Sequence, residues 1–436
     1  MVVTEKSNLP DHLCRPEGFI GELVAYMDET SEYSNPEFYL AAALCLLSVI
    51  SGRKVEDYRG TRTNIFAVSI GPTGGGKEHA RKVLKKLLKD TLLEGPEKFT
   101  AETAIVTALQ QSPALLQQCD EIGLFLKASC NERSPPHMQS VISAMMTIFT
   151  SSDSFWQPKG FARAEYTKGV EQPHLVLHGT TTGEMLFDAL TGSHVTSGFI
   201  GRLMLFMSPE CDYVPMQDYE YKPIPAKIKE FIEAWIAKPY SDGNVATSFK
   251  HETIPTMEIL ADARERIKEH FRAISDRRKD EDKTTAAIWS RASEKTSKLA
   301  MLHTISKGEN CTSLESAEWA IAVSNFLTRR LVALVSNNVA DSEHEKRVQK
   351  MLKIVKKEGI ISLTDFGRKT QWLTLRDRND IAQQLVESGT LLSVYRESAT
   401  RPAAGYTADY SMLKGTDWVL MTPEIRERLK KGDVSK

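Results

Sequence analysis

The sequence predicts an α/β fold with a central parallel sheet, and three features support that prediction. Residues 64–70 are apolar and β-branched, as in a buried parallel strand. A glycine-rich segment follows at once, and from Glu78 apolar residues recur at helical spacing. Further apolar runs, at 113–119, 174–178 and 203–206, supply more strands. We therefore expect strands that alternate with helices and form one parallel sheet.

The segment between the first strand and its helix has the residue types of a phosphate-binding loop. Glycines let backbone N–H groups approach phosphate oxygens, and the helix N-terminus adds partial positive charge. The ammonium of Lys77 is placed to reach the terminal phosphates of a nucleotide. The alternative is a glycine-rich turn that binds nothing. We expect ATP to bind at Gly71, Pro72, Thr73, Gly74, Gly75, Gly76, Lys77 and Glu78.

One residue departs from the usual pattern, in which serine or threonine follows the lysine and ligates Mg²⁺. Glu78 stands at that position. A carboxylate is also a hard oxygen ligand, although it places negative charge beside the triphosphate unless the metal lies between them. We expect Glu78 to bind Mg²⁺. In the helix that follows, we expect the basic residues, Arg81 among them, to lie on the face opposite the apolar one.

Length and composition describe an ordinary globular protein. The 436 residues suffice for two to four domains, and the net charge of −1 means that nucleic-acid binding requires local basic patches. Six scattered cysteines without a CxxC pair indicate a reducing, cytoplasmic location. The longest apolar run, residues 38–50, is too short to span a bilayer, and the N-terminus has no signal-peptide pattern, so we expect no membrane association.

The N-terminal region, residues 1–62, is predicted to be helical. Residues 19–26 are amphipathic, and a second helix begins after Asn35, the predicted N-cap, with Pro36 in its first turn. This second helix is apolar on nearly all sides, so it is expected to be buried, either in the core or between subunits.

Two adjacent acids follow the apolar run 113–119 and resemble the second half of a nucleotide hydrolysis site. Asp120 is expected at the carboxyl end of a strand, where it holds Mg²⁺. Glu121 is expected to polarise the attacking water. Adjacent acids at a turn also occur by chance, and Gln117 and Gln118 make this strand unusually polar.

Aromatic and basic residues alternate over residues 155–168, with Pro158 and Gly160 to form turns. Such a segment can stack on bases and follow a phosphate backbone. The alternative is a hairpin that packs on its own domain. The candidate DNA-binding residues are Trp156, Lys159, Arg163 and Lys168.

Hydroxyl groups and one arginine complete the candidate site. Residues 180–182 are threonines at the end of a strand, and Thr182, then Thr180, is the candidate for holding the attacking water. The alternative is a turn that caps the next helix. Arg202 precedes an apolar strand, where it either reaches the γ-phosphate of a neighbouring subunit or forms an ordinary surface contact.

The remaining chain divides into a helical region without a catalytic motif, residues 216–340, and a C-terminal domain and tail, residues 341–436. The ATPase core is then residues 63–215. The C-terminal pattern of helix, strand, helix, helix and a two-stranded ribbon (391–396 with 417–421) predicts a winged helix. Arg376 and Arg378 would face DNA, with Arg396 and Arg401 on the wing, although such domains also serve protein contacts.

In these segments the chain resembles the phage and prophage family of primase–helicase-like P-loop ATPases. The resemblance covers roughly residues 36–400 and rests on IGPTGGGKEHAR, LLQQCDEIGLFL, HLVLHGTTTGE and SGFIGRLMLF. It implies a RecA/AAA-like P-loop core and an oligomer, with a hexamer favoured, that hydrolyses ATP to move along single-stranded DNA. Because residues 1–62 leave no room for a primase domain, we expect a separate protein to supply priming.

We therefore expect an ATP-dependent DNA helicase or translocase of a mobile-element replication system, with ATP and Mg²⁺ as cofactors. Two alternatives remain. One is a P-loop ATPase that acts as a switch or protein remodeller in defence or packaging. The other is a winged-helix DNA-binding protein that binds nucleotide without turnover.

Overall fold

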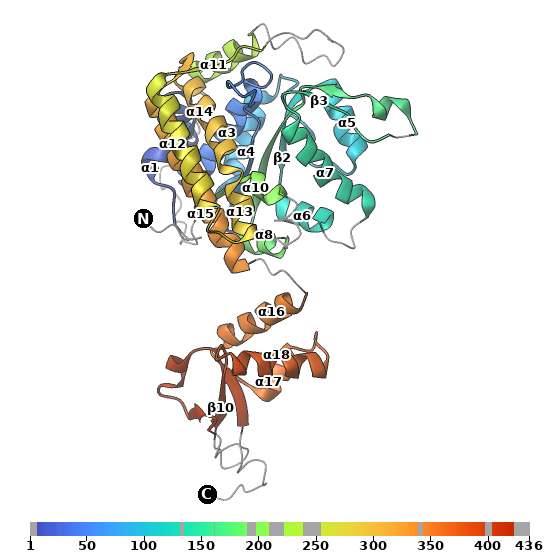
Figure 1. Cartoon of the computed structure of the whole chain (residues 1–436), viewed down its shortest axis with the longest axis vertical. Coiled ribbons are helices and arrows are strands. Elements are labelled where there is room, and N and C mark those ends of the chain that lie inside the picture. The colour runs from blue at the N-terminus through green and yellow to red at the C-terminus, as the bar shows by residue number, and fades with distance from the viewer. Residues whose placement is uncertain are drawn as a thin grey trace, which may run out of the picture. The chain divides into compact units, whose positions relative to one another are not determined.

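The computed structural model describes residues 7–130, 135–160, 162–189, 198–208, 222–238, 254–338, 343–396 and 403–422 (Figure 1). The chain forms two compact units, Met1–Val339 and Ala340–Lys436. The three regions expected before residue 340 all contribute to the first unit. Among the helices of these described ranges, none combines the length and apolar character that a membrane crossing requires.

A four-stranded parallel sheet forms the centre of the first unit, as the sequence predicts. Because all three strand pairings are parallel, the carboxyl ends of the strands meet at one edge. The register there sets Ile70 opposite Thr181 and Cys119 opposite Gly179. The strands, in spatial order, are β2 (Ala114–Cys119), β5 (His174–Thr181), β1 (Phe66–Ile70) and β6 (Leu203–Met207).

Helices cover both faces of this sheet (Figure 1). Successive side chains of β1 alternate between the faces, as strand geometry requires. Phe66, Val68 and Ile70 pack in the hydrophobic cluster that includes α5 (Glu102–Gln111) and α7 (Pro136–Thr150). Ala67 packs in the opposite cluster.

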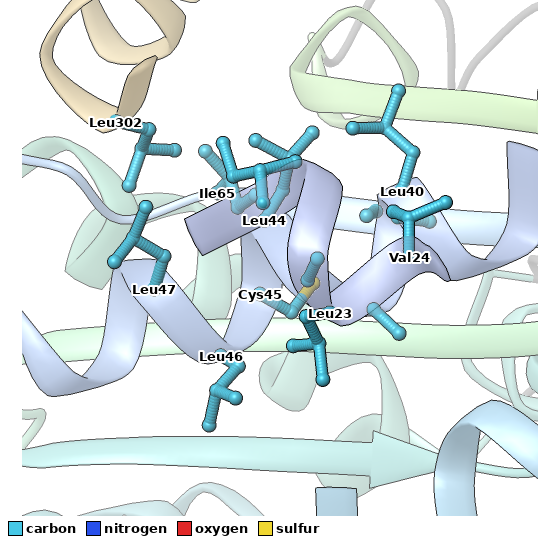
Figure 2. Packing of buried hydrophobic residues seen from close by; sticks show 14 of the residues in the cluster. Leu23, Val24, Leu40, Leu44, Cys45, Leu46, Leu47, Ile65 and Leu302 are labelled. Atoms are coloured by element: carbon cyan, nitrogen blue, oxygen red, sulfur yellow. The ribbon is translucent and has the colours of Figure 1, made fainter. Parts of the chain in front are cut away.

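That opposite cluster is built around α3 (Pro36–Ile50), whose residues after Pro36 are all buried. Figure 2 shows its leucines among side chains of α2 (Phe19–Glu29), Ile65 and α14 (Ala292–Ser306). The helix is therefore buried in the core of its own unit rather than between subunits. Asn35 is the N-cap residue, but its side chain makes no capping hydrogen bond, contrary to the prediction.

A buried ion pair joins α3 to α15 (Leu314–Asn338). Arg330 is 0% exposed and donates to the carboxylate of Glu37, which is 6% exposed. The same carboxylate accepts the backbone N–H groups of Leu9 at 3.0 Å and Met207 at 2.8 Å. One acid thus connects the N-terminal segment, β6 and two helices.

Further helices surround this core (Figure 1). They are α1 (Asp11–Cys14), α4 (Lys77–Leu88), α6 (Ile122–Cys130), α8 (Gly183–Ala189), α10 (Phe199–Arg202), α11 (Ala226–Ile236), α12 (Ala261–Arg277) and α13 (Lys283–Trp289). Two small sheets pair β3 (Phe155–Trp156) with β4 (Val170–Glu171) and β7 (Glu258–Ile259) with β8 (Cys311–Thr312).

Two histidines of β5 are buried in the sheet. His174 is 0% exposed, with Nε2 lying 3.0 Å from the carbonyl oxygen of Ser48, and His178 is 1% exposed. Burial lowers the pKa of each imidazole to about 3. Both are therefore neutral in the folded protein at pH values where the unfolded chain already binds protons.

Acid is expected to destabilise the first unit through these two histidines. Their pKa values are lowered on folding, so their full stabilising contribution is present above about pH 6.5 and is lost as the pH falls toward 3. Each histidine adds up to about 1.4 kcal/mol per pH unit to the slope of unfolding free energy. Urea titrations between these pH values should show a shallower slope for His174→Gln and for His178→Gln. A slope equal to that of the wild type in both variants would contradict this.

In its described residues, the second unit consists of an antiparallel sheet and three α-helices. The helices are α16 (Glu343–Glu358), α17 (Leu363–Lys369) and α18 (Leu375–Glu387). The sheet order is β12 (Trp418–Leu420), β10 (Leu392–Arg396), β11 (Ala403–Thr407) and β9 (Ile360–Ser362). The expected pairing of residues 391–396 with 417–421 is confirmed, since β10 and β12 are antiparallel neighbours, but the loop predicted between them contains a further strand, β11. The small residues of β11 give little strand signal, yet Gly405 lies so close to β9 that a Cβ would meet the carbonyl oxygen of Ile361 at 2.3 Å.

Candidate functional site

The glycine-rich loop lies at the carboxyl edge of the sheet, between β1 and α4. Gly74 and Gly76 have φ angles of +81° and +80°, in the left-handed region that glycine adopts without strain. A cavity of about 710 Å³ opens over this loop, a size typical of small-molecule sites. Its lining includes residues 73–79, Lys82, Val83, Lys86, Asp120 and Glu121, together with Tyr26, residues 30–33 and Lys222.

Lys77, the first residue of α4, joins the ends of two strands. Its Nζ donates to the carbonyl oxygens of Gly71, 2.7 Å away, and Thr181, 3.0 Å away. Burial lowers its pKa, against the opposing effect of Glu121 and Asp120. The loop thus places an ammonium group at the N-terminus of a twelve-residue helix, where anions are favoured.

Asp120 lies directly after β2, as the sequence predicts. Its Oδ1 accepts hydrogen bonds from Thr180 Oγ1 at 2.7 Å and from the Glu121 N–H at 3.1 Å. Burial raises its pKa, but the Thr180 hydrogen bond and the charge of Arg81 outweigh burial, and the net pKa lies below the usual value. The carboxylate is therefore ionised at neutral pH.

Arg81 lies between the two acids that were expected to hold Mg²⁺. Its Nη1 is 2.9 Å from Glu78 Oε2 and 3.1 Å from Asp120 Oδ2. The prediction that Arg81 belongs to the solvent face of α4 was wrong, since its side chain is only 4% exposed. In this arrangement the two acids do not fit a shared metal ion, because the guanidinium already bridges their facing oxygens. Throughout the described ranges, this site included, no group of three or more His, Cys, Asp or Glu side chains is placed to hold a metal ion.

Glu121 has an unusual backbone. Its φ angle of 49° lies in the left-handed region, which costs a residue with a Cβ about 1 kcal/mol or more and often marks functional positions. Its Oε2 is buried and has no hydrogen-bond partner in the described structure. A strained residue with an unpaired carboxylate oxygen in the cavity wall is suited to hold a water molecule or a ligand proton.

Two threonines at the carboxyl end of β5 differ in their contacts: Thr180 lies within the strand and Thr182 directly after it. Thr180, the second choice from sequence, donates to Asp120. Thr182, the first choice, accepts the N–H of Met185 at 3.4 Å and so lies at the start of α8. The structure thus brings Thr180, and not Thr182, to the acidic pair.

Arg202 makes its contacts within its own chain. It is 8% exposed, and it donates to the carbonyl oxygen of Gly198 at 2.7 Å and to Thr150 Oγ1 at 3.2 Å. Burial and the charge of Arg291 lower its pKa to about 10, against Glu294. In this conformation two of its guanidinium nitrogens are bonded to groups of the first unit, and contact with the γ-phosphate of a neighbouring subunit stays a prediction.

The aromatic and basic segment forms the β3–β4 ribbon and the turn η1 (Ala164–Thr167). Trp156 is 3% exposed and packs in the core, so the prediction that its ring stacks on bases does not fit this conformation. The three cations remain at the surface. Lys159 lies 3.3 Å from Glu102 and Arg163 lies 3.8 Å from Glu165, while the exposed Lys168 accepts a hydrogen bond at its carbonyl from Gln110.

In the second unit, Arg376 and Arg378 lie on α18 as expected. The Arg376 side chain is 91% exposed and 3.9 Å from Asp380. Arg378 is half-buried, with Nε lacking a hydrogen-bond partner among the described residues. Arg396 lies 3.6 Å from Asp417, and Arg401 falls outside the described residues.

Sequence reasoning missed Arg81 as a site residue, as well as the segment between α2 and α3. Arg81 lies three and seven residues before the buried Leu84 and Leu88, on the same face of α4. This spacing could have predicted that its side chain is buried. Residues 30–33 carry no motif, yet they line the cavity, and Thr30 Oγ1 lies 3.1 Å from His79 Nε2. Burial, Lys86 and Lys82 lower the pKa of His79, so it is neutral at neutral pH.

Neither a protein-family model nor a curated protein sequence matches the chain.

Proposed function

We propose that the chain is a P-loop ATPase of RecA/AAA-like type that binds ATP at residues 71–78 and hydrolyses it. One observation carries this proposal: the glycine loop, Lys77, Asp120 and Glu121 line a single cavity at the carboxyl edge of a parallel sheet. Ligands of open parallel sheets bind at this edge.

Each residue has a role in the proposed reaction. Lys77 and the N-terminus of α4 bind the terminal phosphates. Glu121 orients the attacking water and accepts its proton. Asp120 is held by a hydrogen bond from Thr180, and it positions Glu121 by accepting the backbone N–H of that residue. We assign Mg²⁺ only as the ion that accompanies ATP, since Arg81 occupies the facing oxygens of Glu78 and Asp120.

We further propose that hydrolysis drives movement on single-stranded DNA, in an oligomeric ring of a mobile-element replication system with a separate primase. The exposed cations Lys159, Arg163 and Lys168 support this role, as does the order of the motifs in the sequence. The second unit would be a winged helix that presents Arg376 to DNA or to a protein partner.

A nucleotide-binding protein without turnover is the second candidate. The observation that favours it is the ion pairing of Arg81 with both acids, which replaces the expected catalytic metal site. A P-loop switch or remodeller remains the alternative in which ATP is hydrolysed but DNA has no effect.

ATP hydrolysis measured with and without single-stranded DNA tests the proposal. The wild type should hydrolyse ATP, and DNA should accelerate it. Lys77→Ala should weaken nucleotide binding by about tenfold or more, since a hydrogen bond to a charged group contributes about 1.5–3 kcal/mol. Lys85→Ala, an exposed position on the same helix and outside the cavity lining, is the matched control.

The outcomes separate the candidates. ATP binding without hydrolysis would support the second candidate. An ATP hydrolysis rate that is the same with and without single-stranded DNA would support the switch or remodeller. Equal nucleotide affinity in wild type and Lys77→Ala, measured by calorimetry, would refute the assigned phosphate loop. Mass measured with a non-hydrolysable ATP analogue would report whether a ring forms.

A further inference from the structure

Arg81 is held where a protein-bound metal ion would be expected. Its Nη1 bridges Glu78 Oε2 at 2.9 Å and Asp120 Oδ2 at 3.1 Å, and its Nη2 lies 3.5 Å from Glu97 Oε1. A Mg²⁺ ion bound to both acids would lie about 2.0–2.1 Å from each oxygen, in the gap that Nη1 now fills. The guanidinium and a shared metal ion therefore exclude each other.

The arginine is also difficult to displace. Its side chain is 4% exposed, and its aliphatic part belongs to the stripe of α4 that contains Leu84 and Leu88. Moving it away would leave a permanently charged group buried without its partners, which is strongly unfavourable. Glu78 and Asp120, whose side chains are 55% and 46% exposed, are held by this contact at the edge of the cavity.

The replacement of a hydroxyl residue by Glu78 is explained by this pairing. A carboxylate beside a triphosphate would repel it, but a guanidinium between the two acids offsets one of their two negative charges without a metal. We propose that Arg81 takes the place of the Mg²⁺ ion, so that this site binds the phosphates of a nucleotide without a divalent cation held by the protein. This inference rests on the proposed nucleotide binding.

Calorimetric titration of a non-hydrolysable ATP analogue, with EDTA or with excess Mg²⁺, tests the inference. The wild-type affinity should differ less than fivefold between the two buffers, and a difference of fivefold or more would overturn the inference. Arg81→Met should bind the analogue at least tenfold more weakly in EDTA and recover in Mg²⁺. A uniform loss in both buffers would assign Arg81 to structure alone and would also overturn the inference.

Glu78→Gln is the variant that keeps the fold, because Glu78 is exposed on the first turn of α4. The substitution removes the repulsion between the Glu78 carboxylate and the phosphates. The affinity for the ATP analogue should therefore rise twofold or more in EDTA and should not fall in Mg²⁺. A fivefold or greater loss confined to Mg²⁺ would show that Glu78 holds the metal and would overturn the inference. Glu32→Gln, an exposed acid of the same cavity, is the matched control for a general charge effect.

Mn²⁺ titration of the nucleotide-free protein, followed by electron paramagnetic resonance, separates this inference from the proposed function. Arg81→Met should bind Mn²⁺ at least tenfold more tightly than the wild type, and equal binding would overturn the inference. If no nucleotide binds in either buffer, the proposed function fails, and the Mn²⁺ result still decides whether Arg81 excludes a metal.

Discussion

Replacing Arg330 with methionine is expected to lower the free energy of unfolding of the first unit by about 3–5 kcal/mol. The substitution would leave the Glu37 carboxylate buried with backbone N–H groups but without its charged partner. Urea unfolding of the full chain, followed by tryptophan fluorescence, measures the loss.

Arg329→Met is the matched control, since Arg329 precedes Arg330 on α15 and is exposed. It should change stability by no more than about 0.5 kcal/mol. Adding Glu37→Gln to Arg330→Met should recover part of the loss, because the uncompensated buried charge disappears. A loss below about 1 kcal/mol in Arg330→Met would mean that the pair contributes little beyond its packing.

Replacing Glu121 with glutamine is expected to reduce ATP turnover by about 10²–10⁴-fold, the usual contribution of general acid–base catalysis. Glutamine keeps the size of the side chain but cannot accept the proton of the attacking water. Nucleotide affinity should stay the same or rise, because one negative charge beside the phosphates is removed. Steady-state hydrolysis and calorimetric binding measure the two effects separately.

Glu184→Gln provides the comparison, as Glu184 is an exposed acid in the first turn of the neighbouring α8. Its turnover should match that of the wild type. Equal turnover in wild type and Glu121→Gln would remove Glu121 from the reaction. The unpaired Oε2 and the positive φ would then require another explanation.

Local pattern was sufficient to predict the parallel sheet and the position of its loop. The apolar run before Gly71 becomes β1, and the apolar run before Asp120 becomes β2, with the acid just beyond its end. These elements are predictable because strand burial and loop chemistry depend on residues adjacent in sequence. The parallel register then brings the two strand ends to one edge without further information.

Contacts between residues distant in sequence determined the positions of several side chains that local sequence patterns could not predict. The charge of Arg81 led to its assignment to solvent, although its spacing matches the buried Leu84 and Leu88. Its partner Asp120 follows β2 and is distant in sequence, so this ion pair could not be predicted from local pattern. Trp156 was expected at the surface for the same reason, since the core that covers it comes from distant segments. Thr180 rather than Thr182 meets Asp120 because of the alignment of β5 with β2.

The sequence by itself determined the chemistry available at residues 71–78 and 120–121 and the strand-and-helix order that carries it. Only the tertiary structure decided which charges face one another there, and in particular that a guanidinium lies between Glu78 and Asp120. The physical reason is that electrostatic interactions act through space over a few ångströms, whereas sequence periodicity reports only which face of an element is buried.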